Sequence, residues 1–362
     1  MNIDLIAGAR PNFIKIAPLI DAIEQSKNNG FDIDYRLIHT GQHYDKNMSI
    51  RFFEQLNIPE PHINLGAGGG TQAEQAGAIM RGYEKVLLNK STDLCVVVGD
   101  VNSTMACAIV ARKMGVKVAH VEGGIRSGDM TMPEEINRIV TDSITNYFFT
   151  TTKLAGENLK KAGVNENAIF FVGNTMIDTL MKFKSSFRKP IFWDKLNLEN
   201  QNYFLLTLHR PSNVDNENSL NNYLVEILKN TSDYPVIFPV HPRTKNTLNK
   251  IGFSNKRLFL TEPMGYLEFN YLTMNSKAVI TDSGGITEET TLMGVPCLTL
   301  RDNTERPETV DIGTNELIGT NPEQLKLALT KILNSTWKKG GIPEKWDGNT
   351  AQRIVEILLK LG

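Results

Sequence analysis

The sequence predicts an α/β protein made of two Rossmann-like domains, each a doubly wound parallel sheet. Short β-branched runs alternate with amphipathic segments of helix length along almost the whole chain, and the runs are apolar enough to be strands buried on both faces. The chain has 362 residues, of which 41% are hydrophobic, whereas a single core stops growing at about 250–300 residues. The strand candidates also outnumber the strands of one ordinary doubly wound sheet. We therefore expect two domains with a ligand cleft between them.

The expected elements follow one another in a regular order. The strand candidates are residues 3–7, 35–39, 94–98, 116–121, 147–150 and 169–172, then 203–208, 236–240, 257–260, 278–281 and 297–300. The segments between them have helical periodicity, most clearly at residues 102–114, 220–229 and 322–333. This alternation of strand and helix is typical of parallel sheets with helices on each side.

A polar stretch with few structural signals, residues 184–202, marks the expected domain boundary. It holds Pro190, Lys195 and repeated Asn. We assign residues 1–183 to an N-terminal domain and residues 184–350 to a C-terminal domain. Residues 351–362 predict a last helix beyond the final strand, which would be free to pack back across the cleft.

The charge balance and the hydropathy exclude several classes of partner. Lys and Arg total 39 against 40 Asp and Glu, a formal net charge of −1, so there is no basic excess to bind a nucleic-acid backbone. No apolar stretch approaches the ~20 residues that a membrane span needs. We expect neither nucleic acid nor a membrane as a partner.

The cysteines and the N-terminal segment indicate the compartment. Cys95, Cys107 and Cys297 lie in or beside apolar runs without metal-ligand spacing, which predicts buried thiols in a reducing compartment. The N-terminal segment lacks the charged start and long apolar centre of a signal peptide. We expect a soluble, cytoplasmic protein.

Polar side chains follow several predicted strands at the point where each strand ends. In parallel α/β sheets ligands bind beyond these carboxyl ends, so such residues are the first candidates for a site. They are Asp100, Glu122, His209, His241 and Asp282. Any one of them alone is equally consistent with an ordinary loop residue or a helix cap.

The best candidate for phosphate binding is Ser283-Gly284-Gly285, between a predicted strand and a predicted helix. Two glycines at such a turn let backbone amides approach an anion, and the helix dipole favours negative charge there. A tight turn with Ser283 as the N-cap explains the same residues equally well. Arg10 and Lys15 add two cations at the start of the first helix, where cations are unfavourable unless an anion accompanies them.

Motifs for common cofactors are absent. No G-x-G-x-x-G follows a strand and no G-x-x-x-x-G-K-[ST] occurs, which argues against tightly held NAD and against ATP chemistry. The histidines show no H-E-x-x-H pattern. We expect no metal site and no cofactor.

Two charged segments each have two interpretations. Glu134 and Glu135 lie in the first turn of a predicted helix, where acids either compensate the helix dipole or contribute to a site. Residues 303–308 alternate in charge and fit an interdomain ion-pair network as well as a site.

A glycine cluster at residues 66–70 precedes Thr71 and Glu74, which have the spacing of a capping box. The cluster is either a flexible loop that enters a helix or a mobile lid.

Taken together, these motifs resemble the non-hydrolysing UDP-N-acetylglucosamine 2-epimerase family. Singly several of them are weak, but they occur in the family's order and spacing over nearly the whole chain, which makes them jointly specific. They are Gly8-Ala9-Arg10-Pro11 through Pro18, Gly41-Gln42-His43, Gly99-Asp100, His120 through Arg126, Pro133 through Arg138, Gly173-Asn174-Thr175, His209-Arg210 and, most densely, Thr281 through Glu308.

The resemblance implies a glycosyltransferase-B-like pair of Rossmann-like domains, of which the C-terminal one binds UDP, and usually a homodimer. It implies interconversion of UDP-GlcNAc and UDP-ManNAc, which would supply N-acetylmannosamine units for surface polysaccharide. The C2 proton of such a sugar is not next to a carbonyl, so simple deprotonation would be prohibitively slow. Elimination of UDP across C1–C2 to a 2-acetamidoglucal, followed by re-addition, avoids this problem. That route needs a diphosphate cradle, acid/base carboxylates and a cation for the leaving group, and the predicted strand ends supply each of them.

The resemblance also implies catalytic roles. Asp100, Glu122 and Glu134 would be the acid/base carboxylates, and His209 would steady the leaving diphosphate. Carboxylates crowded in one cleft would have raised and coupled pKa values, useful for proton transfer near neutrality. Which of the three removes the C2 proton stays open.

Substrate-binding residues follow in the same way. Ser283, Gly284 and Gly285 would hold the phosphates, with Arg10 as their counter-charge. Glu289 would bind the ribose hydroxyls, Phe269 would lie against uracil, and Lys15 would be a further ligand contact.

Several positions depart from the family pattern. Ala9 and Asn12 stand where typical members have Thr and Glu, and Tyr44 replaces the Arg that follows Gly-Gln-His. In bacterial members that segment helps to form a second, activating UDP-GlcNAc site. Gln42 and His43 are therefore the candidate regulatory residues.

Four rival functions remain beside the UDP-GlcNAc 2-epimerase. They are a 2-epimerase of a modified UDP-sugar of the diacetamido-hexuronate type, a hydrolysing relative that releases free ManNAc and UDP, a glycosyltransferase of the same architecture, and a non-catalytic nucleotide-sugar sensor. The sensor ranks last, since it would not require Asp100, Glu122, Glu134 and His209 together.

Overall fold

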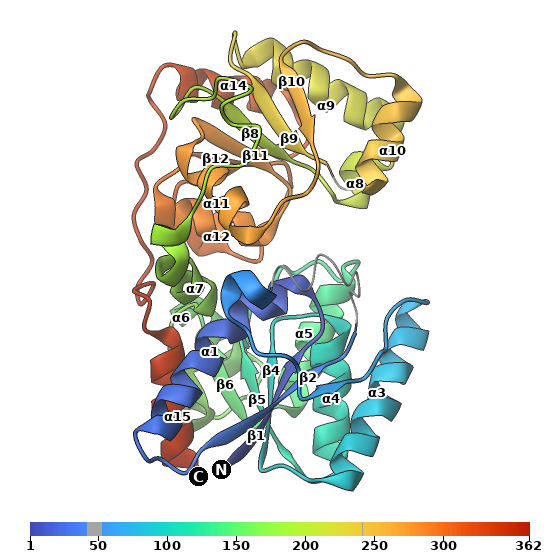
Figure 1. Ribbon diagram of the computed structural model, residues 1–362, viewed down its shortest axis with the longest axis vertical. Helices are drawn as coiled ribbons and strands as arrows, with labels where there is room; N and C mark the ends of the chain where they lie inside the picture. Colours follow the sequence, from blue (N-terminus) through green and yellow to red (C-terminus); the bar gives the residue numbers. More distant parts are fainter. Residues whose placement is uncertain (42–52, 241) are drawn as a thin grey trace. The chain divides into compact units, whose positions relative to one another are not determined.

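Two parallel sheets organise the chain in the computed structural model, which describes residues 1–41, 53–240 and 242–362 (Figure 1). They belong to two units, the first made of Met1–Lys182 and Glu344–Gly362 and the second of Phe183–Pro343. Gln42, His43 and His241 lie outside the described residues. Within the part of the chain that is described, no helix is long and apolar enough to cross a bilayer.

The first unit contains a seven-stranded sheet with the order β3-β2-β1-β4-β5-β6-β7. The chain begins in the middle, moves to one edge, returns to β4 beside β1 and continues to the other edge, as in a doubly wound fold. The strands are β1 (Asn2–Ala7), β2 (Asp34–His39), β3 (Ile63–Asn64), β4 (Leu94–Val98), β5 (Lys117–Val121), β6 (Tyr147–Thr150) and β7 (Ile169–Phe171). Each neighbouring pair is parallel.

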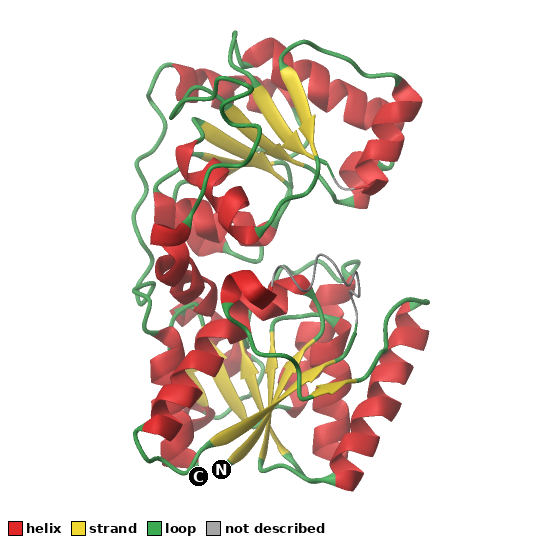
Figure 2. Cartoon of the chain, viewed as in Figure 1, coloured by secondary structure: helices red, strands yellow, loops and turns green. Residues whose placement is uncertain are grey.

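Helices cover both faces of this sheet (Figure 2). They are α1 (Arg10–Asn28), α3 (Gln72–Asn89), α4 (Asn102–Lys113), α5 (Pro133–Ile144), α6 (Lys153–Lys161), α7 (Thr175–Phe183) and α15 (Thr350–Leu361), with a 3-10 turn η1 (Glu166–Ala168). Helices α1 and α15 pack together on one face, and α3, α4 and α5 lie in a row on the other. Strand β4 is buried at every position because helices lie on both sides of it.

The second unit repeats the plan with six strands in the order β10-β9-β8-β11-β12-β13. The strands are β8 (Phe204–Thr207), β9 (Val236–Pro239), β10 (Leu258–Thr261), β11 (Ala278–Thr281), β12 (Cys297–Thr299) and β13 (Asn315–Leu317). Its helices are α8 (Pro211–Val214), α9 (Glu217–Asn230), α10 (Pro242–Ile251), α11 (Tyr266–Asn275), α12 (Gly284–Met293), α13 (Pro307–Asp311) and α14 (Pro322–Leu333), with η2 (Lys184–Ser186).

Alternate residues of β8 build the two cores of the second unit. Phe204 and Leu206 pack into one buried cluster with residues of α9 and α14. Leu205 points to the other, which contains Leu272 of α11. The period of two explains why the strands of this unit are apolar throughout.

The predicted fold class, two doubly wound parallel sheets, is confirmed. The strands missed by the sequence are β3 and β13, which have only two and three residues. Neither contains a β-branched run, so they exist only because a neighbouring strand offers them backbone partners. The capping box at Thr71 is confirmed, since its side chain accepts from Glu74 N and the Glu74 carboxylate accepts from Thr71 N at 2.8 Å.

The boundaries of the units differ from the expected ones. Within the stretch expected to be a linker, Trp193 and Leu198 are buried in a core of the second unit, which the polar composition around them concealed. The chain enters the first unit again at Glu344 instead of at residue 351. The physical reason is that Lys345 donates to the Phe171 carbonyl at 2.7 Å and Trp346 is buried before α15 begins.

Asp178 of α7 attaches the start of α15 to the first unit. Its carboxylate accepts a hydrogen bond from Ala351 N at 2.7 Å, and it is 6% exposed. Burial raises the pKa of Asp178 to about 6 from an ordinary value of 3.8, although the bonds from the helix start oppose this shift. The folded chain therefore binds this proton more tightly than the unfolded chain does.

The stabilisation by this proton is fully present below about pH 3.8 and is lost as the pH rises through about 6. We expect Asp178→Asn to remove that pH dependence, worth about 3 kcal/mol across the range, while its amide oxygen still accepts from Ala351 N. The variant should match or exceed the native chain in thermal stability at pH 7 and lose that advantage near pH 4. Thermal unfolding as a function of pH measures both.

Asp347→Asn is the matched control, because the hydrogen bond and charge of Arg353 lower the pKa of Asp347. Stability from that carboxylate is lost as the pH falls, so this variant should shift the profile in the opposite sense. If the two variants had the same dependence of thermal stability on pH, the raised pKa assigned to Asp178 would be wrong.

Candidate functional site

Neighbouring strands of the first sheet bring the predicted polar residues of this unit to one edge. The order β1-β4-β5 sets the end of β1, with Arg10 and Lys15 in the following helix, beside Asp100 after β4 and Glu122 after β5. Parallel strands share the edge at which they end, so this grouping follows from the topology.

Lys15 forms an ion pair with Glu122 almost out of contact with water. The distance from Nζ to Oε2 is 2.7 Å, and the two side chains are 9% and 2% exposed. Glu122 has a φ of +74°, a left-handed conformation that is strained for a residue with a side chain. The predicted ligand contact Lys15 thus contacts a candidate catalytic carboxylate directly.

Asp100 is held by two residues of α5. Arg138 reaches its carboxylate at 2.5 Å, and Asn137 donates to its backbone carbonyl at 2.9 Å. The Asp100 side chain remains 29% exposed, so it is fixed in place and still accessible to a ligand.

The structure separates the two acids at the start of α5. Glu135 is buried and accepts from Ser127 N, Gly128 N and Arg138. Burial opposes ionisation of Glu135, but these donors outweigh it and lower its pKa. Glu134 is half-buried, and the described part of the chain offers its carboxylate no hydrogen-bond partner. The bonds of Glu135 give it a structural role, whereas Glu134 remains a candidate site residue.

The first helix begins at Arg10, which is half-buried. Asn12 closes this turn: its amide oxygen accepts from Gly8 N and Ala9 N, and its amide nitrogen donates to the Val98 carbonyl at 2.9 Å. The carboxylate of a Glu at this position could not make the last bond, because it has no donor. Asn12 thus joins the turn after β1 to the end of β4.

In the second unit, Asp282 organises the end of β8. It is fully buried at the end of β11 and accepts from the backbone N–H groups of His209 and Arg210 and from Asn213. The ring nitrogen Nδ1 of His209 lies 2.7 Å from Asp282 Oδ1. Burial opposes ionisation of Asp282, but the bond and charge of His209 outweigh it and lower the pKa of Asp282.

His209 itself is 55% exposed. With Nδ1 directed to Asp282, the ring presents Nε2 to solvent. This is the orientation that a histidine needs to donate a proton or a hydrogen bond to an anion.

The N-terminus of α12 carries the predicted phosphate residues. Ser283 occupies the N-cap position, but its side chain makes no capping hydrogen bond, and the first turn contains no acidic residue. Gly284 and Gly285 form the first two helical positions and are half-buried. Ser283 is thus the N-cap by position without a side-chain capping bond, and the backbone geometry of the turn suits an anion.

Glu289, one helical turn further along α12, faces α11. Asn270 of α11 lies 3.5 Å from Glu289 Oε1, and Glu289 is 5% exposed. Burial, and then the charge of Glu289, raise the pKa of Tyr266. Phe269 of the same helix is half-buried. The structure thus places Phe269 and Glu289 on adjacent helices.

The charged segment at residues 303–308 forms ion pairs inside the second unit. Arg306 contacts Glu288 at 3.0 Å and Arg301 contacts Glu305 at 2.8 Å. Their partners Glu288 and Arg301 lie on α12 and on the loop after β12. This segment braces the helix that carries the phosphate candidates.

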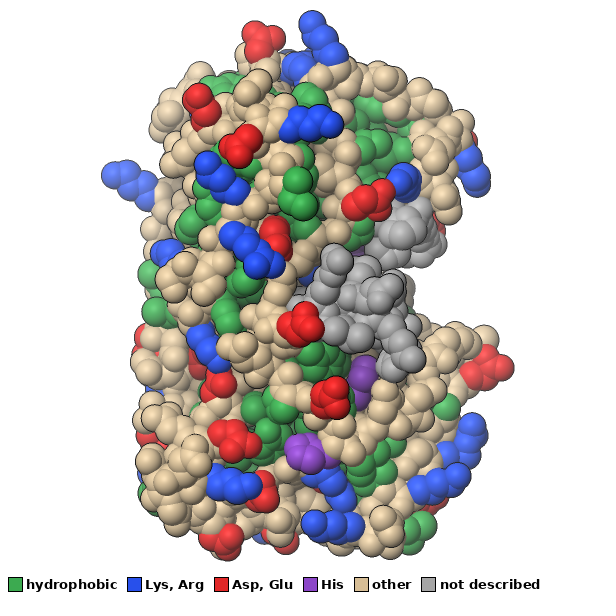
Figure 3. All heavy atoms as spheres, in the orientation of Figure 1, with side chains coloured by type: hydrophobic (Ala, Val, Ile, Leu, Met, Phe, Trp, Pro, Cys, Tyr) green, Lys and Arg blue, Asp and Glu red, His purple; other side chains and the backbone are tan. Residues whose placement is uncertain are grey.

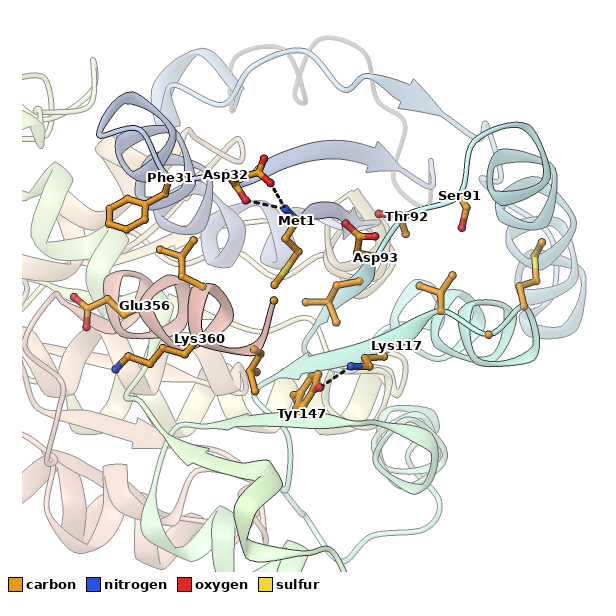
Figure 4. Close-up of a pocket in the computed structure, with 17 residues that line it drawn as sticks. Met1, Phe31, Asp32, Ser91, Thr92, Asp93, Lys117, Tyr147, Glu356 and Lys360 are labelled. Carbon is orange, nitrogen blue, oxygen red and sulfur yellow. Dashed lines mark hydrogen bonds and ion pairs between the residues drawn. The ribbon is translucent and has the colours of Figure 1, made fainter.

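A cavity of about 1090 Å³ lies at the opposite edge of the first sheet, where the strands begin (Figure 4). Met1, Lys117, Tyr147 and the last turn of α15 line it, and Lys117 donates to the Tyr147 hydroxyl at 3.2 Å. The residues that line this cavity include none of the predicted site residues. Cavity size therefore does not mark the candidate site.

Charges of both signs are interspersed on the face drawn in Figure 3, and the described side chains there form no continuous basic patch. Among the residues that the structure describes, no group of three His, Cys, Asp or Glu could hold a metal ion. The three cysteines are free and buried, as predicted.

Sequence reasoning left four functional neighbours without a role. They are Arg138, Asp142, Asn213 and Asp282. Asp282 stood in a recognised motif and at a strand end, which was a usable signal. Arg138 also stood in a recognised motif, residues 133–138, whereas Asp142 shows only as a buried charge on α5, which buries its polar face.

Known proteins resemble this chain over its whole length. The sequence matches the family described as UDP-N-acetylglucosamine 2-epimerase over residues 24–359. A UDP-N-acetylglucosamine 2-epimerase of Methanocaldococcus jannaschii is 45% identical, with 99% of each chain covered. A UDP-2,3-diacetamido-2,3-dideoxy-D-glucuronate 2-epimerase of Pseudomonas aeruginosa is 39% identical, with 100% of each chain covered.

Solved structures of related proteins are similar to this chain over its whole length. The crystal structure of the Methanocaldococcus jannaschii UDP-GlcNAc 2-epimerase in complex with UDP-GlcNAc and UDP has a TM-score of 0.90 and 44% identity, and covers 100% of both chains. A Staphylococcus aureus protein, solved with UDP, has a TM-score of 0.89 at 28% identity and covers 99% of this chain and 96% of its own. The predicted glycosyltransferase-B-like fold is confirmed by these neighbours.

The contribution of the Lys15–Glu122 ion pair to the free energy of unfolding can be tested with variants. Lys15→Met leaves the Glu122 carboxylate buried without its counter-charge, so we expect the free energy of unfolding to fall by about 3–5 kcal/mol. The double variant Lys15→Met/Glu122→Gln removes both charges and should recover most of that loss. Urea unfolding of the single and double variants measures the coupling.

The control is the exposed pair Lys27–Asp34, with side chains 47% and 54% exposed. Lys27→Met should leave the urea midpoint unchanged. If the double variant were no more stable than Lys15→Met, the loss of stability would not come from the unpaired charge of Glu122, and the prediction would be wrong.

Proposed function

The chain belongs to the UDP-N-acetylglucosamine 2-epimerase family, and on this premise we propose that it is a non-hydrolysing isomerase that interconverts UDP-GlcNAc and UDP-ManNAc. The observation that carries the proposal is the pairing of carboxylates and cations at neighbouring strand ends, Glu122 with Lys15 and Asp100 with Arg138. It occurs in a chain that is similar over its full length to epimerases named for this substrate.

The reaction proceeds by elimination and re-addition. A carboxylate takes the C2 proton, the C1–O bond breaks, its electron pair leaves with UDP, and C1 and C2 become doubly bonded. UDP then adds back to C1 while a proton is delivered to C2 on the opposite face. The two steps balance without an external oxidant or reductant.

The three carboxylates differ in their surroundings, and we use this difference to assign the proton acceptors and the proton donor. Lys15 contacts Glu122 and Arg138 contacts Asp100, and we assign these two carboxylates as the proton acceptors. Glu134 has no cationic partner among the described residues, and we assign it as the group that donates the proton to C2. Acceptor and donor on different elements allow protonation from the face opposite to removal.

Residues of the second unit hold the leaving group in this proposal. The N–H groups at the start of α12 bind the diphosphate, and His209, oriented by Asp282, donates to it as negative charge develops. Arg10 supplies a counter-charge, Glu289 binds the ribose and Phe269 lies against uracil.

A second candidate substrate is a UDP-diacetamido-hexuronate. The Pseudomonas aeruginosa relative named for that sugar is 39% identical over the full length of both chains. The relatives named for UDP-GlcNAc are more similar, at 45% and 41%, so we place UDP-GlcNAc first. The same catalytic residues serve both sugars, since the reaction at C1 and C2 is the same.

Incubation with UDP-GlcNAc in deuterated water, followed by NMR, tests the proposal. We expect UDP-ManNAc that carries deuterium at C2, because the acid that delivers the new C2 proton has exchanged its own proton with the solvent. Free ManNAc with UDP would identify a hydrolysing enzyme instead. No change of UDP-GlcNAc but turnover of the diacetamido-hexuronate would identify the second substrate, and turnover of neither would overturn the epimerase proposal.

Amide variants test the catalytic roles. Asp100→Asn and Glu122→Gln should abolish turnover while UDP binding, measured calorimetrically, stays largely intact. Glu134→Gln should lower turnover without lowering thermal stability, whereas Glu135→Gln should lower stability. Glu84→Gln, at an exposed position of α3, is the control and should change neither. A near-normal rate for Asp100→Asn or Glu122→Gln would contradict the assignment.

The homodimer is part of the proposal, and α5 supports it. This helix buries Asn137, Arg138 and Asp142, whereas Ile136 and Ile139 are 44% and 38% exposed. A helix at a free surface has the opposite polarity. We place a second copy of the chain against this apolar face.

The proposed compartment is the cytoplasm. The three cysteines are free and buried, which fits a reducing compartment.

Ile136→Lys combined with Ile139→Lys should convert the dimer to a monomer, because two charges would be buried at the contact. Size-exclusion chromatography with light scattering measures the mass. Leu327→Lys on α14, at a site 55% exposed, is the control and should leave the mass unchanged. An unaltered dimer in the double variant would exclude this face.

A further inference from the structure

His120 of β5 has no role in the proposed reaction, yet it lies between the two strand ends that carry Asp100 and Glu122. It is fully buried. Its Nδ1 lies 2.7 Å from Asp142 Oδ1, and its Nε2 lies 2.8 Å from the Gly99 carbonyl oxygen. Both ring nitrogens therefore face oxygen atoms at full hydrogen-bond distance.

Neither of these oxygens has a proton to give. A backbone carbonyl only accepts. Asp142 accepts at its other oxygen from Arg126 at 2.6 Å and from Gly124 N at 3.0 Å, which favours the carboxylate. Burial opposes ionisation of Asp142, but the bond and charge of His120 and the charge of Arg126 outweigh it and lower the pKa of Asp142. A neutral imidazole would direct a lone pair at one of the two acceptors.

The two bonds of His120 hold the two turns on which the site depends. Gly99 has a φ of +69° and immediately precedes Asp100. Gly124, two residues after Glu122, has a φ of +81°, and a Cβ there would lie 2.2 Å from the Ala155 carbonyl oxygen. Asp142 fixes Gly124 through its N–H, and His120 joins Asp142 to Gly99. One chain of bonds thus runs from the end of β5 to the end of β4.

We propose that His120 is a positioning residue, doubly protonated at neutral pH, that holds the Gly99–Asp100 turn through its bond to the Gly99 carbonyl. The Asp142 carboxylate contacts the charged ring at 2.7 Å, and the second cation that it contacts, Arg126, is partly exposed to solvent at 21%. The other charged groups near it are the Lys15–Glu122 pair and the Asp100–Arg138 pair at the same strand ends, and Arg138 also contacts Glu135. The kinetic part of this inference rests on the proposed function, and the protonation state does not.

The protonation state is measured on the full-length protein labelled with 15N-histidine. Ring nitrogen shifts distinguish a protonated nitrogen from a bare one. His62 is the internal contrast, since its Nδ1 accepts from Leu37 N at 3.0 Å and must be bare. Signals are assigned with His120→Gln and His62→Gln. Two protonated nitrogens for His120 near neutral pH are expected, and one bare nitrogen would overturn the proposal.

Asp142→Asn is a second, milder variant. Its amide can donate to His120 Nδ1 while its oxygen still accepts from Gly124 N. His120 should then become neutral, with a bare Nδ1 and a proton kept on Nε2 for Gly99. If both nitrogens stayed protonated in this variant, Asp142 would not be what holds the charge.

Kinetics test the positioning role. His120→Gln should lower kcat by about 10²-fold, because a misplaced carboxylate costs about that much, with KM changed by less than about threefold. Asp142→Asn should lower kcat less, because Gly99 keeps its donor. His62→Gln should change neither value. Equal losses in kcat and in folded fraction for His120→Gln would overturn the positioning role. A native protein without epimerase activity would refute the proposed function alone.

Discussion

An ion pair almost closed to water, Lys15 with Glu122, joins the first helix to the end of β5. Burying either charge without a partner costs several kcal/mol. Each side chain therefore stays buried because the opposite charge of the other stabilises it. The sheet order then fixes the neighbours, since β4 lies between β1 and β5. Asn12 and Arg138 complete the arrangement by joining the end of β4 to α1 and to α5.

Both units use a buried carboxylate and a histidine at a strand end, with different results. Asp142 and Asp282 each accept a backbone N–H from a turn after a strand and contact a histidine ring. The His120 ring is fully buried and uses both nitrogens inside the protein, whereas the His209 ring is 55% exposed and uses one. The first arrangement suits a role in holding backbone, and the second suits contact with a ligand.

Much of the fold and part of the site could be predicted from residue pattern. The strands were recognisable because burial on both faces demands continuous apolar runs, and β4 is the clearest case. The short strands β3 and β13 were not, because pairing alone makes them strands. Trp193 and Leu198 were hidden in a polar stretch for a related reason: two apolar residues have no period, and only a neighbouring core shows that they are buried.

The sequence by itself determined the architecture, the identity of the strand-end residues and the family resemblance, because these depend on local pattern and on the order of motifs. Only the tertiary structure decided which of two adjacent acids is structural, what Lys15 contacts, and that Asp282 orients His209. The last two of these assignments depend on residues that are distant in the chain: Lys15 and Glu122 are separated by 107 positions, and His209 and Asp282 by 73. Ion pairing and burial act through space, so residue spacing cannot show them.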